Sequence, residues 1–490
     1  MNNVRARASE HRTELVATFG LVSLYLAVMS GHFLSSDGLV MWRQALAIVY
    51  HGSWTFVPPI WWGSYLTSSG RGIGASLQYF PGLIFFPWLS SHVPVGTGQQ
   101  FDFKLLYGDL LYVVAGAPIW VLITAASAYL VALTARALGG DGRTTLWAIA
   151  FYGLGSPALA ASRGDWPQPL LAICWIGGLY ACLRYVNAGP RRWAWVCAAA
   201  ICYAVLTRPL EGSLLLLGLL VLLALRARRD WWSLAVIGGG WVAAVVITLI
   251  LNQVRFGSFA TFGYAGSQLQ WTTPIWIGLP GDLLSPGRGI IWQFPAVVLA
   301  VLGTIYLWRA GKRLEAVIVV GLPALLLIEA AVYVDWVGGW NWGFRFIQPA
   351  LPWLAVLAAF GVPQLPDALR RWVPAVLLAG GILWNIPAVV TDLLGGYGSA
   401  YAATAPNFRF DAYPPIGAWR FLHHIRPTNG TDGGAVDIVW FRATRVAGWI
   451  AVIPFVALMA AAVALWISAV RGVGRRPSAP PPIRPPARLH

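Results

Sequence analysis

The chain has 490 residues, of which 58% are hydrophobic and only 11% are charged. Its formal net charge is +16 and its mean hydropathy is +0.65. Apolar runs of about 20 residues recur between arginines, a pattern typical of a multi-span helical membrane protein and one that excludes a soluble protein. The arginines collect in the loops that we assign to the inner face, so the positive charge orients the spans and does not indicate nucleic-acid binding.

The cysteines and the start of the chain add little chemistry. The four cysteines lie in apolar segments, without metal-ligand spacing and without a loop context for a disulfide, so we interpret them as packing residues: Cys174, Cys182, Cys197 and Cys202. Arg5, Arg7 and Arg12 precede an apolar run long enough to span, with no obvious small-residue cleavage site. We therefore expect a retained first helix and not a cleaved signal peptide.

The first predicted span covers about residues 14–34 and carries the chain from inside to outside. An aromatic outer loop follows at 35–107, and within it residues 39–49 show the one-sided apolarity of a helix that lies in the membrane interface. Spans at about 108–135 and 145–161 come next, and a fourth descends to Arg184. A short fifth and sixth span form a tight pair around residues 207–212.

The second half continues with a span at about 232–252 and an eighth span that begins after residue 289. The ninth span rises to Asp335, and the tryptophan-rich loop 336–345 turns the chain back. Two further spans flank an inner loop with Arg370 and Arg371, and the last span follows residue 446. The sequence thus predicts an all-α polytopic membrane protein with about twelve transmembrane helices and with interfacial helices in its first outer loop.

We divide the chain on this basis into a transmembrane core at 1–391, which includes the outer loop 35–107, and an outer loop at 392–446. The last transmembrane helix is expected at 447–470. Residues 471–490 are rich in proline and arginine and have too few apolar residues to fold, so we expect a disordered tail. An even number of spans and the inner arginines place both termini in the cytoplasm and the protein in the plasma (inner) membrane.

Asp37 is the first candidate for chemistry, because it sits at the outer end of the first span. An acid at that depth must be solvated, paired with a cation or involved in function. The alternative is structural, since an aspartate in this position can cap a helix that begins at Gly38. Asp165, in the next outer loop, is a second candidate acid, with a helix-end role before Pro167 as its alternative.

Basic and aromatic residues are predicted to gather at the same face as Asp37. Guanidinium groups bind phosphate bidentately, and tryptophan and tyrosine rings stack on sugars, so such a face suits a phosphorylated, sugar-bearing ligand. Structural alternatives remain for three of these features: Arg288 can be an interfacial anchor, Arg208 can pair with Glu211 within a turn, and the tryptophans can form an aromatic belt. The candidate substrate-binding residues are Arg43, Tyr79, Arg163, Arg208, Arg255, Arg288, Trp340, Asn341 and Arg345.

Several of these segments resemble the GT-C-type integral-membrane glycosyltransferases. The resemblance touches most of residues 14–390, and its motifs are individually loose, so it is to the superfamily and not to one enzyme. It is carried by Asp37-Gly38 before a helix that ends Tyr50-His51-Gly52, by Tyr79-Phe80-Pro81-Gly82, by Thr207-Arg208-Pro209, and by segments 252–257, 285–289 and 338–345.

The resemblance implies transfer of a sugar from a polyprenyl-phosphate donor to a lipid, glycan or protein acceptor on the outer side. Asp37 would match the family's first-loop acid, which acts as a base on the acceptor hydroxyl or helps to hold a metal, and Asp165 would match a second acid. Asp37 is followed by Gly38 and not by a second acid, and one carboxylate makes a poor divalent site. We therefore expect no cofactor; a divalent metal is conceivable but unsupported.

Two other classes of protein stay open at this point. A transporter or flippase of a lipid-linked or amphipathic substrate fits twelve spans equally well, and Glu329 in the ninth span is the residue that it would use. No internal repeat is evident, however, and the acids and arginines are predicted at one face and not at the membrane midplane. A non-catalytic scaffold does not explain so many aromatic and basic residues on outer loops.

Overall fold

A computed structural model gives the structure of the chain. It describes residues 11–54, 72–85, 112–164, 166–187, 189–226, 230–261, 270–338, 342–392, 414–427 and 434–474. Within these ranges the chain forms helices and no β-strand, apart from one isolated bridge between His424 and Ala435. The all-α class predicted from the sequence is confirmed.

The first half of the chain supplies the following elements: α2 (Arg12–Ala27), α3 (Ser36–His51), α4 (Gly74–Leu77), α5 (Phe80–Phe85), the π-helical turn η4 (Tyr112–Gly116), α6 (Ala117–Ala137), α7 (Gly142–Gly153), α8 (Ala158–Ala161), α9 (Gln168–Val186), α10 (Arg192–Thr207), α11 (Pro209–Arg226) and α12 (Trp231–Phe256).

The second half supplies α13 (Ile275–Leu284), α14 (Ile290–Gln293), η6 (Pro295–Val298), α15 (Leu299–Arg309), α16 (Arg313–Val332), η7 (Arg345–Ala350), α17 (Leu351–Gly361), η8 (Val362–Gln364), α18 (Asp367–Arg370), α19 (Trp372–Val390), α21 (Pro414–Phe421), α22 (Val439–Arg442), α23 (Thr444–Ala447), η11 (Gly448–Val452) and α24 (Ile453–Gly474). Here η6, η7, η8 and η11 are short 3₁₀ helices.

Eight helical segments of the described ranges are long and apolar enough to cross a membrane. They are Tyr112–Ala137, Gln168–Val186, Pro209–Arg226, Trp231–Phe256, Arg313–Val332, Arg345–Gln364, Asp367–Val390 and Val439–Val473. Three shorter apolar helices accompany them: Arg192–Thr207, Ile275–Leu284 and Pro295–Arg309. The multi-pass architecture is confirmed, whereas the count of twelve is not, because helices such as the 16-residue α2 are about 24 Å long and fall short of the roughly 30 Å hydrocarbon layer.

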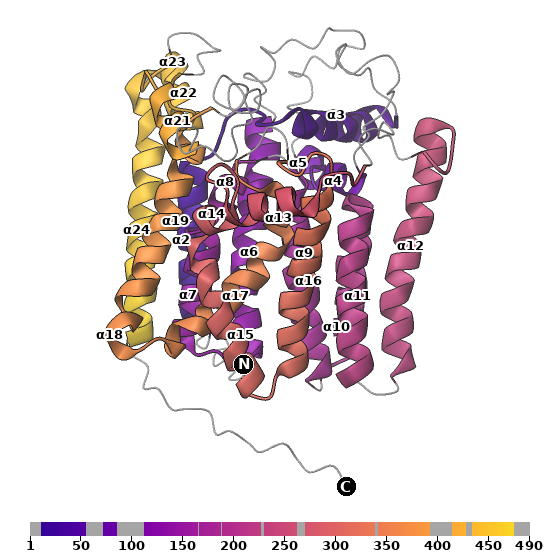
Figure 1. Cartoon of the computed structure of the whole chain (residues 1–490). Coiled ribbons are helices and arrows are strands. Elements are labelled where there is room, and N and C mark those ends of the chain that lie inside the picture. Colours follow the sequence, from indigo (N-terminus) through magenta and orange to yellow (C-terminus); the bar gives the residue numbers. More distant parts are fainter. Residues whose placement is uncertain are drawn as a thin grey trace, which may run out of the picture.

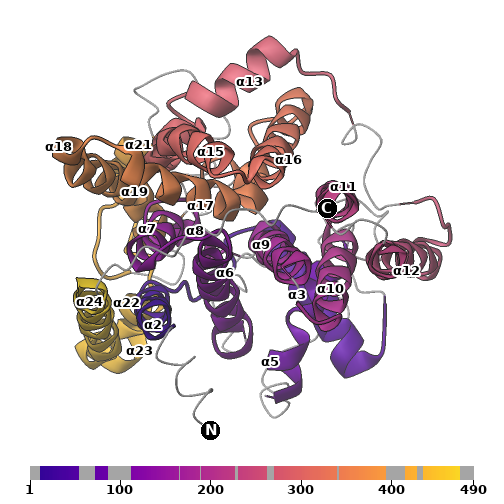
Figure 2. The same cartoon turned by 90° about the horizontal axis from the view of Figure 1, so that it is seen from below.

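The long helices run side by side along one axis, and α3 lies across one end of them (Figure 1). The short helices α4, α5, α8, α13 and α14 lie near the same end. Seen along the bundle, α2 and α24 lie together at one edge, and α12 stands at another (Figure 2). The interfacial helix predicted at 39–49 is therefore confirmed as the central part of α3.

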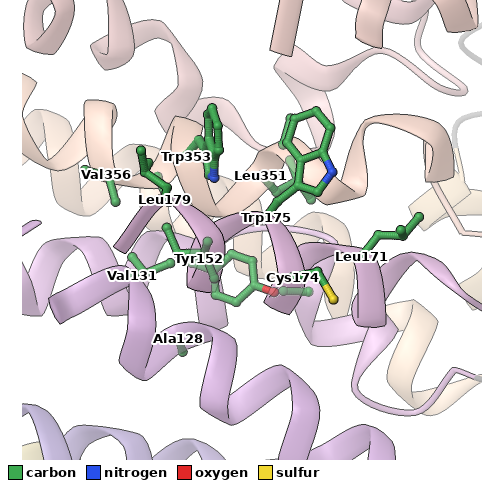
Figure 3. Close-up of a cluster of buried hydrophobic side chains, with 14 of the residues drawn as sticks. Ala128, Val131, Tyr152, Leu171, Cys174, Trp175, Leu179, Leu351, Trp353 and Val356 are labelled. Atoms are coloured by element: carbon green, nitrogen blue, oxygen red, sulfur yellow. The ribbon is translucent and has the colours of Figure 1, made fainter. Parts of the chain in front are cut away.

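The core of the bundle is packed between α6, α7, α9 and α17 (Figure 3). Trp175 of α9 and Trp353 of α17 are both fully buried, with ring centroids 5.3 Å apart. Around them lie apolar side chains from all four helices: Ala128, Val131, Tyr152, Leu171, Cys174, Leu179, Leu351 and Val356. The cysteines Cys174, Cys182 and Cys197 are buried and all four are free, as the sequence predicted for packing residues.

Glycines bring some helices into backbone contact. A side chain at Gly303 of α15 would meet the carbonyl oxygen of Leu357 in α17 at 1.8 Å, and one at Gly361 would meet that of Leu299 at 2.2 Å. Inside lipid no hydrophobic effect drives helices together. Close backbone packing at small residues contributes to helix association instead. By contrast, a side chain at Gly238 or Gly239 of α12 would meet nothing within 4 Å.

Basic residues mark the end of the bundle opposite α3. Arg136, in the last turn of α6, donates from Nε to Glu14 of α2 at 2.7 Å, and Thr145 of α7 donates to the same carboxylate at 3.0 Å. Arg226 at the end of α11 pairs with Glu315 at the start of α16, 2.7 Å away. The sequence assigns both arginines to inner loops, and the structure brings them to the same end of the bundle.

Candidate functional site

Asp37 lies at the start of α3, but it does not cap this helix. The N-cap is Ser35, whose side-chain oxygen accepts a hydrogen bond from the backbone N–H of Gly38 at 2.9 Å. The capping alternative for Asp37 is therefore wrong, since the helix begins at Ser36 and its N-cap residue is Ser35. The Asp37 carboxylate remains in the positive field of the helix N-terminus and is only 8% exposed.

The structure brings Asp37 together with Arg345 of η7, a residue more than three hundred positions away. Arg345 Nη1 lies 3.6 Å from Asp37 Oδ2, and both side chains are mostly buried, at 16% and 11% exposure. The Arg345 guanidinium also lies over the ring of Phe346, 5.2 Å from its centroid. The ion pair confirms that these two predicted site residues share one location.

A second guanidinium shares the Phe346 ring. Arg208, at the start of α11, lies 5.4 Å from the centroid of Phe346. Its Nε is 2.8 Å from Glu211 Oε1, so the pairing within the turn that the sequence left open is present. Asp37, Arg345, Phe346, Arg208 and Glu211 thus form one group, which we call the ring site: two arginines around one aromatic ring, with Asp37 beside Arg345 and Glu211 beside Arg208.

A network of buried amides holds Arg345 in place. The backbone N–H of Phe344 donates to Gln293 Oε1 at 2.8 Å, and Asn385 Nδ2 donates to the Gln293 carbonyl oxygen at 3.0 Å. Trp342 Nε1 donates to Asn385 Oδ1 at 3.2 Å. Gly343 adopts a φ of 71°, and a side chain there would meet Gln293 Oε1 at 2.3 Å, so only glycine fits this turn.

Arg288 supports the same loop from the tight turn at 285–289. Its backbone N–H donates to Ser285 Oγ at 3.0 Å, and its Nη1 donates to the carbonyl oxygen of Gly343 at 2.8 Å. Arg288 is only 2% exposed. An interfacial anchor keeps its charge in water, so the snorkelling alternative for Arg288 is wrong, and its contacts are those of a residue that positions the Arg345 loop.

Tyr79 belongs to a buried aromatic cluster. Its ring lies 5.1 Å from Trp42 of α3, 6.4 Å from Tyr112 and 6.0 Å from Trp120 of α6, and the Phe33 ring packs against Tyr112 at 3.9 Å. Tyr79 itself is fully buried. The cluster fastens α3 to the bundle, and substrate binding by Tyr79 stays a prediction.

The structure gives less information on the remaining predicted site residues. Arg43 is half-buried on α3, and Arg255 is buried near the end of α12, with its guanidinium 4.9 Å from the ring centroid of Phe256. Asp165, Trp340 and Asn341 lie outside the described residues. Their assignments, like those of Arg43 and Arg255, stay predictions.

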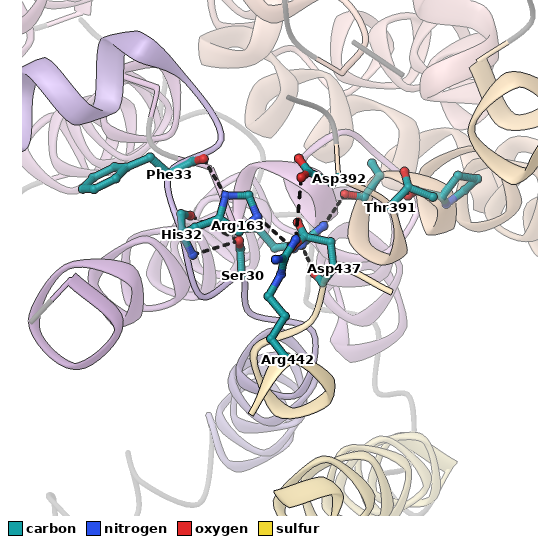
Figure 4. Close-up of polar contacts among 10 residues, drawn as sticks. Ser30, His32, Phe33, Arg163, Thr391, Asp392, Asp437 and Arg442 are labelled. Atoms are coloured by element: carbon teal, nitrogen blue, oxygen red, sulfur yellow. Dashed lines mark hydrogen bonds and ion pairs between the residues drawn. The ribbon is translucent and has the colours of Figure 1, made fainter. Parts of the chain in front are cut away.

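Arg163 takes part in a different group, which we call the buried ionic network (Figure 4). Its Nη2 lies 2.6 Å from Asp437 Oδ2, and its Nη1 donates to the carbonyl oxygen of Ala388 at 2.6 Å. His32 Nε2 lies 2.7 Å from Asp437 Oδ1, as does Arg442 Nε. Arg442 Nη2 is 3.6 Å from Asp392 Oδ2. The network joins segments before α3, after α8, after α19 and around α22.

Two arginines and His32 surround Asp437 and lower its pKa. Burial by itself raises the pKa of Asp437, but the charges of His32, Arg442 and Arg163 outweigh burial and hold this pKa well below its usual range. His32 Nδ1 faces the carbonyl oxygen of Phe33 at 2.7 Å, while Nε2 faces the ionised Asp437.

His32, Asp392 and Asp437 also form a possible set of metal ligands, because one ligand atom from each lies within 4.8 Å of the others. Their other contacts do not fit a metal. Arg163 and Arg442 already occupy the Asp437 oxygens, and His32 Nε2 is directed at Asp437 Oδ1. This group is therefore an ion-pair network in the described part of the chain, and the expectation of no cofactor stays a prediction.

Asp282 is a buried acid of another kind. It lies on α13, a short helix across the end of the bundle, and is fully buried. In the described ranges neither of its carboxylate oxygens has a hydrogen-bond partner. Burial raises the pKa of Asp282 to about 9, so this side chain is neutral at pH 7.

Sequence reasoning missed His32 and Asp437. His32 lies five positions before Asp37 at the end of the first apolar run, which was its only signal. Asp437 lies in a loop predicted to be outside, with Arg442 five residues later. Neither residue belongs to a local sequence motif, because His32 and Asp437, which contact each other, are 405 positions apart in the sequence.

No family model matches the sequence, and no curated protein matches it. Solved structures do: the fold is similar to that of ArnT from Cupriavidus metallidurans bound to undecaprenyl phosphate, with a TM-score of 0.53 at 16% identity over 94% of this chain and 76% of that chain. The apo structure of the same protein gives a TM-score of 0.52 at 16% identity, covering 94% and 75%. This chain has the GT-C glycosyltransferase fold.

The GT-C fold confirms the resemblance stated from the sequence, at the level of architecture. ArnT is a GT-C glycosyltransferase, and the match extends over nearly the whole of the present chain. The multi-pass membrane character is confirmed with it. At this identity the likeness carries the fold alone, so activity, donor and site roles rest on the geometry of the ring site.

Proposed function

We propose that this protein is a membrane glycosyltransferase that moves a sugar from a polyprenyl-phosphate donor to an acceptor hydroxyl, with Asp37 as the base. The observation that carries the proposal is the ring site: a carboxylate at a helix start and two arginines around one aromatic ring, at the end of a GT-C-type bundle. The ArnT structure bound to undecaprenyl phosphate supports the donor class.

Asp37 has the chemistry that the base needs. Its ion pair with Arg345 favours the ionised carboxylate, which is the form that can accept a proton. In the proposed reaction the acceptor hydroxyl gives its proton to Asp37, and the oxygen attacks the anomeric carbon of the sugar. The bond between that carbon and the phosphate oxygen breaks, and the lipid phosphate leaves with the bonding electrons.

Arg345 and Arg208 are the groups that would stabilise the departing phosphate. Negative charge grows on the phosphate oxygen as the bond breaks, and fixed guanidinium donors in a mostly buried site stabilise that charge without reorganising. Arg345 is held by the buried amide network of Gln293 and Asn385, so its position is set before the donor arrives. A phosphate that binds here displaces part of the existing ion pairs to Asp37 and Glu211.

The side of the membrane follows from charge. Arg136, Arg226 and Lys312 lie at the end opposite α3, which the positive-inside rule assigns to the cytoplasm. The ring site would then face the extracytoplasmic side of the plasma membrane, with both termini in the cytoplasm. The acceptor is a lipid, glycan or protein that reaches this face.

The test is transfer from radiolabelled polyprenyl-phosphate sugars by the purified protein in liposomes. We expect Asp37→Asn to lower turnover by about 10² to 10⁴, the usual contribution of a general base, and to retain donor binding. Asp367→Asn is the matched control, because Asp367 is an exposed acid paired with Arg370 at the other end of the bundle. Full activity of Asp37→Asn would refute the assignment of the base.

The transporter alternative is decided by the same liposomes. Glu329, the residue that it would use, lies three positions before the end of α16 and accepts a hydrogen bond from Trp271 Nε1 at 3.3 Å. That position is near the α3 end of the bundle and not at its middle, which does not favour a midplane transport site. Donor that crosses the bilayer without sugar transfer would establish the transporter and end the glycosyltransferase proposal.

A further inference from the structure

A cavity of about 510 Å³ lies between α2 and α24, at the end of the bundle away from the ring site. α2 contributes Arg12, Thr13 and Val16, which share one face of that helix. The residues from α24 lie within its last three turns: Ala464, Ile467, Ser468, Ala469, Arg471 and Gly472. The volume lies in the range of small-ligand sites.

The cavity has a polar end and an apolar end. Arg12 is the first residue of α2 and Arg471 lies in the last turn of α24, so both guanidiniums start from the same end of the pair. Val16, Ala464 and Ile467 lie one to two turns deeper, toward the bundle centre. From Ala464 to Arg471 the helix rises by about 10 Å, the depth over which a lipid passes from phosphate to acyl chain.

The two arginines carry unbalanced charge. In the described part of the chain neither Arg12 nor Arg471 forms an ion pair or a hydrogen bond through its side chain, and no acid lines the cavity. Glu14, the acid next along α2, is turned to Arg136. Two like charges on adjacent helices repel each other, so an anion between them is favoured.

Other features of the cavity suit a phosphate that arrives on a lipid. The helix N-terminus of α2 opens at Arg12, and its N-cap residue His11 forms no side-chain capping bond. The cavity opens on the flank of the bundle and not into the core, because most of its lining residues are exposed: Arg12, Ala464, Ile467, Ser468 and Arg471. Basic pockets between helices at a membrane surface bind anionic lipid headgroups.

We propose that this cavity binds the headgroup of an anionic phospholipid from the leaflet at this end of the bundle. The phosphate lies between Arg12 and Arg471, with the Ser468 and Thr13 hydroxyls beside it, and one acyl chain follows the apolar lining residues Val16, Ala464 and Ile467. The site is separate from the ring site and does not depend on the proposed glycosyltransferase activity. Its occupant joins the first and last helices of the bundle.

The experiment measures lipid retention by native mass spectrometry of the purified protein, equilibrated with phosphatidylglycerol or with phosphatidylcholine of the same chain length. We expect wild type to retain phosphatidylglycerol preferentially, and excess inorganic phosphate not to displace it. The double variant Arg12→Gln/Arg471→Gln should lose on the order of 10-fold in retention, because each arginine contributes separately to anionic-lipid binding.

The matched control removes two charges from the same end of the bundle. Arg370 is paired with Asp367 at 3.0 Å, and Arg371 lies over the ring of Trp372, so Arg370→Gln/Arg371→Gln should retain phosphatidylglycerol as wild type does. Equal retention of the two lipids by wild type, displacement by free phosphate, or equal loss in both double variants would overturn the proposal. The wild-type comparisons decide it even where a variant fails to fold.

Discussion

The ring site and the buried ionic network use the same kinds of group at the same end of the bundle, with opposite results. In the network His32, Arg163 and Arg442 enclose Asp437, whose side chain is fully buried. In the ring site Arg345 pairs with Asp37 and Arg208 with Glu211, and Arg208 and Arg345 keep 27% and 16% of their side chains exposed. Fully buried charges that pair with one another hold segments together, whereas partly exposed charges are accessible to a ligand.

The largest effect is expected from Asp437→Asn. This change leaves Arg163, His32 and Arg442 with no full countercharge in a buried place, and breaking a buried pair costs about 3–5 kcal/mol. The measurement is unfolding of the detergent-solubilised protein by heat or denaturant. Asp367→Asn, at an exposed pair, should leave the midpoint unchanged. A midpoint of Asp437→Asn equal to that of wild type would mean that the network does not stabilise the fold.

Arg345→Gln, in the ring site, should lower activity, whereas Asp437→Asn, in the buried ionic network, should lower stability. It removes a donor aimed at the leaving phosphate, and losing one such donor costs about 10²–10³ in turnover. Stability should change little, because the loop is held by Gln293 and Asn385 and not by the Arg345 charge. The measurement is kcat with the polyprenyl-phosphate donor beside an unfolding curve. A large loss of stability with normal kcat would reverse the roles of the two regions.

Lowering the pH should also distinguish the buried ionic network from the ring site. The pKa of Asp437 is lowered in the folded protein, so the stability that it contributes is fully present above the unfolded value, about 3.9, and is lost as the pH falls toward the folded pKa. Thermal unfolding between pH 7 and pH 3 should show stability that falls only below about pH 4. Asp437→Asn should lack this step, and a variant curve parallel to that of wild type would exclude Asp437 as its source.

The smallest effect is expected from Glu211→Gln, and its sign is opposite to that of Arg345→Gln. Removing the carboxylate that pairs with Arg208 removes one group that competes with the donor phosphate for this guanidinium. We expect KM for the donor to fall by about two- to fivefold, because the pair is partly exposed on the Arg208 side, with kcat little changed. A rise in KM would show that Glu211 itself contacts the substrate or holds Arg208 in its binding orientation.

Much of the fold was predictable from the sequence, because hydropathy and arginine placement are local signals. The interfacial helix at 39–49 and the inner arginines follow from patterns within a few residues. The number of spans was less predictable: short helices such as α10, with 16 residues, fall below the length of a full crossing. The division of the chain into a core, an outer loop and a last helix stays a prediction.

The ring site could be anticipated only in part. Asp37, Arg208 and Arg345 were each candidates by type and position, but their meeting around Phe346 depends on the packing of α3, α11 and η7. Arg163 was also a candidate, and the structure places it in the ionic network. Sequence periodicity indicates which face of a helix is apolar, but not which distant residue will lie opposite it. The partners of Arg163 could therefore not be predicted from the sequence.

The pairing of α2 with α24 has a consequence for biosynthesis. The backbone N–H of Val439 donates to Met29, and Trp440 donates to Leu26, so the end of the first helix is completed by residues made some four hundred positions later. Until the last helix inserts, Gly20 and its neighbours on α2 lack the partner that the last helix provides. The nascent chain must keep this face of α2 free, or covered by another membrane component, for nearly the whole of translation.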